Sequence, residues 1–152
     1  MATILIVEDE AKMRRLLELN LGDDGFTTLS AGDAETGLKL LQENGVDLVV
    51  TDLKLPGMSG LEFLQAVKRQ NAALPVVVMT AFGTVETAVE AMKAGASDYV
   101  LKPFSLARCG WWCIRSWMSA ICAKKTGRCA RRWGNGMRIR ILWRAARRCR
   151  RR

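Results

Sequence analysis

The residues of this chain that could do chemistry lie at the ends of short apolar runs. Glu8 and Asp9 follow the first run, Asp52 and Thr80 close two later runs, and Lys102 follows the last one. A carboxylate such as Asp52 can attack phosphorus and form an acyl phosphate. Neighbouring carboxylates repel one another unless a cation joins them, and Mg²⁺ prefers oxygen ligands. Lysine and hydroxyl groups can bind phosphoryl oxygens. The set therefore predicts magnesium-dependent phosphoryl transfer to Asp52.

The elements that must position these residues alternate between strands and helices. The apolar runs are short, continuous and rich in β-branched residues, which is typical of strands buried on both faces of a parallel sheet. Four stretches with helical spacing of apolar residues separate them. Right-handed crossovers then give an α/β fold with a doubly wound sheet, whose strand ends meet at one ligand-binding edge. The predicted strands lie near residues 3–7, 27–30, 47–51, 75–80 and 98–101.

Each of these residues taken alone has an ordinary structural explanation. Adjacent acids often cap a helix, an aspartate before Pro56 and Gly57 could belong to a turn, and a single lysine is usually solvated. Their joint placement at one edge of one predicted sheet favours the functional interpretation.

Sequence motifs at four of the strand ends resemble those of a known family. On these motifs, residues 1–104 resemble the receiver domain of bacterial two-component response regulators, which has the fold of the chemotaxis regulator. The resemblance implies a flavodoxin-like, five-stranded parallel sheet with strand order 2-1-3-4-5. The motifs are Val7–Glu10, Thr51–Gly60, Met79–Gly83 and Asp98–Phe104.

The resemblance also implies a role for each acidic residue. Asp52 would accept a phosphoryl group from a histidine of a sensor kinase. Glu8, Asp9 and Asp52 would hold Mg²⁺, with the backbone carbonyl of Lys54 as a further ligand. Such a domain is a signalling module that helps to catalyse its own phosphorylation and dephosphorylation, and we do not expect a conventional enzyme.

A second group of implied roles concerns the conformational switch. Thr80 and Tyr99 resemble the switch pair, in which the hydroxyl moves toward the phosphoryl group and the aromatic ring turns inward. Lys102 would reach the phosphoryl group, and its peptide bond with Pro103 is expected to be cis, as in the family. The switch would bias a face formed by the fourth helix, fifth strand and fifth helix, through which two copies could pair.

The stretch 80–104 is most similar to regulators of the nitrogen-regulation type, which act with sigma-54 RNA polymerase. Their central ATPase domain needs a Gly-x-x-x-x-Gly-Lys-Ser/Thr phosphate loop, and this sequence contains none. Control of transcription is therefore the expected output class, without an ATPase in this chain.

The composition changes sharply near Leu106. Residues 1–106 contain all 15 acids and 9 Lys+Arg, whereas residues 107–152 contain 15 Lys+Arg, no acid, and all five tryptophans and five cysteines. We interpret 1–106 as the receiver domain and 107–152 as a basic tail that replaces the usual fifth helix and is not a separate domain.

Three interpretations of the tail remain open. The first is a shifted reading frame: in the alternative phase, the codons of Trp111–Trp112 must encode Val, those of Trp117–Met118 must encode Asp, and permitted codon choices restore a string similar to the family's fifth helix. The second is a nucleic-acid-binding tail, in which Lys, Arg and Trp contact phosphates and bases; a frameshifted tail would bind nucleic acid only adventitiously. The third is an amphipathic membrane-surface helix, or its simpler version, a helix docked where the fifth helix belongs.

One rival function and the expected compartment complete the predictions. A small Mg²⁺-dependent phosphatase of similar topology usually has a second aspartate two residues after its nucleophile, where this chain has Lys54. Met1–Thr3 leads directly into a strand, and no apolar run approaches the roughly 20 residues of a membrane span. We therefore expect a cytoplasmic protein with no membrane segment.

Overall fold

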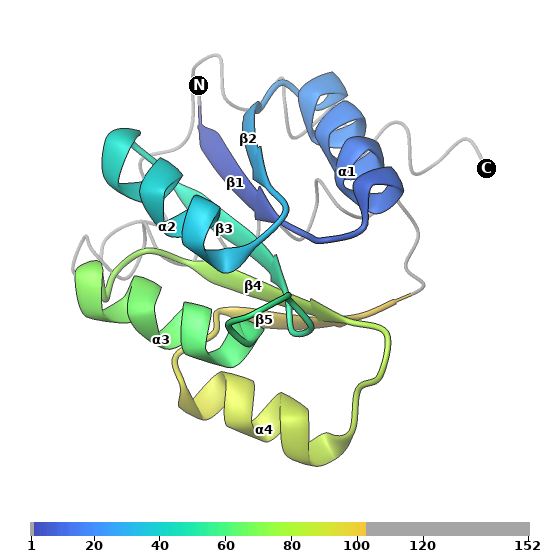
Figure 1. The fold of residues 1–152 in the computed structure, drawn as a ribbon, viewed down its shortest axis with the longest axis vertical. Helices are drawn as coiled ribbons and strands as arrows, with labels where there is room; N and C mark the ends of the chain where they lie inside the picture. Colours follow the sequence, from blue (N-terminus) through green and yellow to red (C-terminus); the bar gives the residue numbers. More distant parts are fainter. Residues whose placement is uncertain (1, 103–152) are drawn as a thin grey trace, which may run out of the picture.

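A computed structural model describes residues 2–102 of the chain. They form a parallel sheet with the strand order β2-β1-β3-β4-β5, in which helices alternate with the strands along the sequence (Figure 1). This is the predicted flavodoxin-like arrangement, and each strand lies within one residue of its predicted ends. The elements are β1 (Thr3–Val7), α1 (Ala11–Asp23), β2 (Thr27–Ala31), α2 (Ala34–Glu43), β3 (Leu48–Asp52), α3 (Gly60–Gln70), β4 (Val76–Thr80), α4 (Val85–Lys93) and β5 (Asp98–Leu101).

The two faces of the sheet are covered by different helices. Figure 1 shows α1 on one side of the sheet and α2, α3 and α4 on the other. Successive side chains of a strand point to opposite faces, so Leu5 packs in the cluster with Phe63 of α3, and Ile6 packs in the cluster with Leu17 of α1. Burial on both faces explains why the inner strands β1, β3 and β4 are nearly continuous apolar runs.

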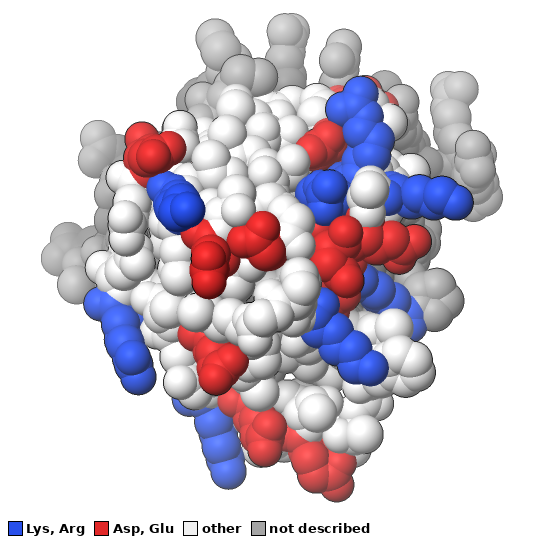
Figure 2. All heavy atoms as spheres, viewed as in Figure 1, with Lys and Arg blue, Asp and Glu red and all other residues white. Residues whose placement is uncertain are grey.

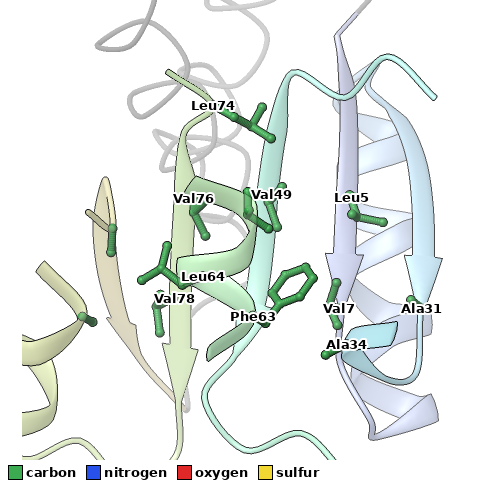
Figure 3. Packing of buried hydrophobic residues seen from close by; sticks show 13 residues of the cluster. Leu5, Val7, Ala31, Ala34, Val49, Phe63, Leu64, Leu74, Val76 and Val78 are labelled. Atoms are coloured by element: carbon green, nitrogen blue, oxygen red, sulfur yellow. The ribbon is translucent and has the colours of Figure 1, made fainter. Parts of the chain in front are cut away.

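The cluster that contains Leu5 and Phe63 is the larger of the two, and it packs α3 against the sheet. Phe63 is completely buried and lies between the side chains of Val49 on β3 and Val7 on β1 (Figure 3). Burying an aromatic side chain of this size stabilises the fold by about 2 kcal/mol or more. The packing fixes the two central strands relative to each other, and these strands carry Glu8 and Asp52.

The helices in the described part of the chain begin in two different ways. The side chains of Asp33, Ser59 and Thr84 accept a hydrogen bond from a backbone N–H of the first turn of α2, α3 and α4, respectively. Such caps satisfy N–H groups that have no partner within the helix. Helix α1 begins after Glu10, whose side chain forms no such bond.

Several sequence predictions concern residues 103–152 and lie outside the described residues. These are the conformation of the Lys102–Pro103 peptide, the fifth helix, the pairing face that would include it, and all three interpretations of the basic tail. The boundary at residue 106 also stays a prediction. None of the helices within residues 2–102 has the length and apolar character needed to span a bilayer.

Candidate functional site

Two acidic residues meet at the carboxyl ends of the central strands. Val7 of β1 pairs with Thr51 of β3, so Glu8 and Asp52, the next residue of each segment, emerge side by side. Both belong to the few polar residues of the described chain that are buried, with exposures of 1% and 7%. Parallel pairing of β1 with β3 thus forces two carboxylates together in a poorly solvated position.

The side chain of Lys102, which follows β5, bonds to both carboxylates. Its Nζ donates a hydrogen bond of 2.6 Å to Glu8 Oε2 and one of 2.8 Å to Asp52 Oδ2. The lysine directly follows β5, and its side chain is only 11% exposed. One ammonium therefore neutralises part of the charge of two acids that are 44 residues apart in the sequence.

The electrostatics of this trio, Glu8, Asp52 and Lys102, reflect its burial. Burial is the largest effect on Glu8; together with the charge of Asp52 it outweighs the bond from Lys102 and raises the pKa of Glu8 from 4.5 to about 7. Burial alone would lower the pKa of Lys102, but its bonds to Asp52 and Glu8 outweigh burial and raise that pKa. The site therefore holds more negative charge than one lysine balances, and a further cation would relieve it.

Asp9 completes a set of oxygen donors that could hold that cation. Glu8, Asp9 and Asp52 each offer a carboxylate oxygen, and these oxygens lie within 4.8 Å of one another. Asp9 is exposed, so the set opens to solvent on one side. Figure 2 shows acidic side chains gathered where the loop between β1 and α1 lies in Figure 1, with basic side chains beside them. An all-oxygen donor set fits a hard divalent cation such as Mg²⁺.

The remaining predicted site residues lie around the trio without bonding to it through their side chains. The Thr80 hydroxyl is buried at the end of β4 and accepts a hydrogen bond of 3.2 Å from the Phe82 N–H. The Lys54 backbone N–H donates to Asp52 Oδ1 at 3.2 Å. Tyr99 is half-buried, and its hydroxyl lies 3.0 Å from the hydroxyl of Thr87, not of Thr80. The predicted switch pair thus makes its hydrogen bonds to other groups in this conformation.

Two side-chain contacts near the site are absent from the sequence predictions. The Lys54 ammonium lies 4.2 Å from the centroid of the exposed Phe82 ring. Thr87 hydrogen-bonds both to Tyr99 and to Thr84 in the cap of α4. The contact of Lys54 with Phe82 and that of Thr87 with Tyr99 could not be found from the sequence, because each joins residues of different segments and depends on how these segments pack.

Gly60 holds the loop after Asp52 against the start of α3. Its N–H donates to the Leu53 carbonyl at 2.9 Å. A Cβ atom at this position would overlap the Asp52 carbonyl oxygen and the Leu53 Cα, both of which are backbone atoms. Only glycine permits this close approach of the start of α3 to the backbone of Asp52 and Leu53.

Comparisons with known proteins agree with the fold and the site. Residues 4–109 match the response regulator receiver domain family. Regulatory protein AtoC of Escherichia coli is 43% identical over 103 residues, which are 68% of this chain and 22% of that protein. Response regulator protein PilR of Pseudomonas aeruginosa is 41% identical over 104 residues, 68% of this chain and 23% of that protein.

Solved structures show the same similarity. NtrX from Brucella abortus, crystallised with ADP, superposes with a TM-score of 0.77 at 35% identity. The match covers 82% of this chain and 29% of the NtrX chain. A response regulator receiver domain protein from Clostridium thermocellum gives a TM-score of 0.72 at 31% identity, over 82% of this chain and 97% of its own.

The parallel sheet and the acidic strand ends define a receiver domain. The chain belongs to the response regulator receiver domain family, the receiver class of two-component signal transduction. It spans only about a fifth of the length of relatives such as AtoC and PilR.

Proposed function

We propose that this receiver domain accepts a phosphoryl group on Asp52 from a sensor histidine kinase, in a reaction that requires Mg²⁺. The observation that carries the proposal is the buried trio of Glu8, Asp52 and Lys102, in which one cation faces two carboxylates. Buried charges reduce stability unless they are well paired, so their placement at a ligand-binding edge favours a chemical role.

The transfer would use the carboxylate of Asp52 as the nucleophile. One of its oxygens forms the new O–P bond while the P–N bond to the kinase histidine breaks and the imidazole nitrogen keeps the bonding electrons. Lys102 is placed to contact a phosphoryl oxygen, and the Thr80 hydroxyl would donate to another after leaving the Phe82 N–H. Glu8, Asp9, Asp52 and the Lys54 carbonyl would hold Mg²⁺, which neutralises charge on the transferring group.

The output would be a conformational change that controls transcription in the cytoplasm. Regulatory protein AtoC and the transcriptional regulatory protein YkoG of Bacillus subtilis support this output class. The contact between Tyr99 and Thr87 supports a route for the change, because it connects β5 directly to the first turn of α4. Movement of Thr80 toward a phosphoryl group would free space near Tyr99, whose rotation would release α4.

A magnesium-dependent phosphatase is the second candidate from the sequence. The position two residues after Asp52 would have to supply a general acid in such an enzyme. It carries Lys54, whose ammonium lies over the Phe82 ring. This favours a phosphoacceptor domain over a conventional enzyme.

Intact mass after incubation with Mg²⁺ and acetyl phosphate tests the proposal. The protein should gain one phosphoryl group of about 80 Da, and the Asp52→Asn variant or added EDTA should abolish the gain. Asp47→Asn is the matched control, because Asp47 is an exposed aspartate at the opposite edge of the sheet. Phosphorylation that persists in Asp52→Asn, or none in a folded wild type, would refute the assignment of Asp52.

A further inference from the structure

The loop that carries Glu8 and Asp9 lacks the fixation that the other helix starts receive. Within residues 2–102, α2, α3 and α4 each begin with a side-chain cap, whereas Glu10 provides none for α1. A helix start without a cap is held less firmly, by about 1 kcal/mol for an average helix, so the loop before it is less well defined. The proposed metal ligands therefore lie just before a helix start that has no side-chain cap of its own.

Arg14 supplies the missing constraint from within the helix. Its guanidinium Nη1 donates to the backbone carbonyl of Glu8 at 2.6 Å and to that of Asp9 at 3.3 Å. Its own backbone N–H donates to the Glu10 carbonyl at 2.9 Å, so the first turn of α1 anchors the side chain. One half-buried cation thus bonds to the backbone carbonyls of both acids and not to their carboxylates.

The turn after β2 confines the guanidinium from the opposite side. A Cβ atom at Gly32 would lie 3.2 Å from Arg14 Nη1, tighter than an ordinary van der Waals contact. The Glu8 N–H also donates to the Ala31 carbonyl at 3.1 Å. The Arg14 head group therefore fits between the loop that carries the acids and the turn that begins at Ala31, with little room to move.

We propose that Arg14 is a positioning residue for the metal site. By holding the backbone of Glu8 and Asp9, it presets the direction of their carboxylates toward Asp52, so that a divalent cation binds without first ordering the loop. The inference rests on the proposed magnesium site but concerns a side chain that contacts neither the cation nor the phosphoryl group. Groups that orient metal ligands in this way typically contribute 10- to 100-fold to metal affinity.

Charge and position predict opposite effects when Arg14 is removed. If the guanidinium acted only as a nearby positive charge, its loss would strengthen the binding of Mg²⁺, because like charges repel. If it positions the ligands, its loss would weaken binding. The sign of the change in affinity therefore separates a positioning role from a purely electrostatic one.

The test compares Arg14→Gln with Arg15→Gln in the full 152-residue chain. Arg15 is the neighbouring arginine of the same helix, its side chain is 70% exposed, and it pairs with Glu18 at 3.1 Å. Both variants lose the same charge. Titration with MgCl₂, followed by the chemical shifts of the Asp9 and Asp52 amides, should give an affinity about tenfold weaker for Arg14→Gln and unchanged or slightly tighter for Arg15→Gln.

A second readout needs no metal. Hydrogen exchange of the Glu8 amide in EDTA should be faster in Arg14→Gln than in wild type and Arg15→Gln. The Asp47 amide, which donates to the Thr3 carbonyl at the opposite edge, should be unchanged in all three. Slower or equal exchange at Glu8, or an unchanged or tighter Mg²⁺ affinity in Arg14→Gln, would overturn the positioning role.

Failure of the proposed metal site and failure of the positioning role of Arg14 give different results. A wild type that binds no Mg²⁺ refutes the proposed metal site, and the exchange comparison then still decides whether Arg14 fixes the loop. If Arg14→Gln does not fold, Arg14→Lys takes its place. The lysine ammonium keeps the charge but cannot reproduce the planar bonding of the guanidinium to both carbonyls, so we expect several-fold weaker Mg²⁺ binding. Unchanged Mg²⁺ binding in Arg14→Lys would overturn the inference.

Discussion

The two edges of the sheet treat polar side chains differently. At the amino edge, Asp47 accepts from the Thr3 N–H at 2.9 Å and Ser97 accepts from the Val76 N–H at 3.3 Å, and both residues are exposed. At the carboxyl edge, Glu8 and Asp52 are buried and bonded to the Lys102 ammonium. The polar groups at the first edge bond to backbone N–H groups, whereas the charged groups at the second also bond to one another.

The difference separates structural from functional polarity. An exposed side chain that accepts from a backbone N–H stabilises the end of a strand at little desolvation cost. A buried set of charges pays that desolvation, and apolar replacements would often be as stable or more stable. The burial of charges at the carboxyl edge, where stability alone gives no reason for it, is what supports the proposed chemical role of this edge.

Replacing Gly60 at the carboxyl edge and Gly45 at the amino edge should give the largest difference in stability. In Gly60→Ala the new Cβ would overlap backbone atoms of Asp52 and Leu53, so we expect destabilisation of about 3 kcal/mol or more, or failure to fold. Gly45→Ala, at the amino edge, meets no atom within 4 Å and should change stability by less than about 0.5 kcal/mol. Urea unfolding measures both, and equal effects would contradict the close approach at Gly60.

Removing the buried cation should have the next largest effect. Lys102→Met leaves the carboxylates of Glu8 and Asp52 without the cation that pairs with both, which should lower the free energy of unfolding by about 2–4 kcal/mol in EDTA. Added Mg²⁺ should restore part of this loss because it replaces the missing charge. Lys12→Met, an exposed lysine of α1, is the control. A loss of stability that Mg²⁺ leaves unchanged would argue against a cation site beside Lys102.

The pH dependence of stability should reveal Glu8. Because its pKa is raised from 4.5 to about 7 on folding, the folded state binds more protons between these pH values. Its contribution to stability is therefore complete below about pH 4.5 and is lost as the pH rises through 7, by about 3 kcal/mol in total. Glu8→Gln should remove this slope in thermal unfolding with EDTA. Glu43, an exposed glutamate of α2, provides the control. Loss of the pH slope in Glu43→Gln would contradict its assignment to Glu8.

The smallest effect is expected at the amino edge. Asp47→Ala removes the acceptor of the Thr3 N–H, but water can replace it at this exposed position. The free energy of unfolding should fall by about 0.5–1 kcal/mol, by the same amount with and without Mg²⁺. A magnesium-dependent effect in chemical denaturation would show that the two edges are coupled.

The fold was predictable because the three inner strands, β1, β3 and β4, are buried on both faces. Runs such as Val76–Met79 have no polar residue to interrupt them, and their regular alternation with helical stretches permits few topologies. The convergence of Glu8, Asp9, Asp52 and Lys102 followed from the topology, since parallel strands end at one edge.

The details around the site were less predictable. The sequence indicates that Lys102 is near two acids, but the two bonds of its ammonium depend on how far β5 extends along β4. The two hydrogen bonds from Arg14 to carbonyl groups depend on the bend between β1 and α1, and no residue pattern predicts that bend. Tyr99 bonds to Thr87 because α4 approaches β5 at that turn, a tertiary contact that local spacing does not encode.

The mutual bonding of Glu8, Asp52 and Lys102 also restricts how the sequence can change over time. Replacing Lys102 alone leaves two carboxylates without their cation in a poorly solvated position, and replacing both acids leaves the ammonium unpaired, whereas replacing all three by apolar residues of similar size leaves no charge. Substitutions at these positions should therefore be strongly epistatic. A descendant that gave up phosphoryl chemistry would be expected to lose all three charges together, and its stability would no longer respond to magnesium.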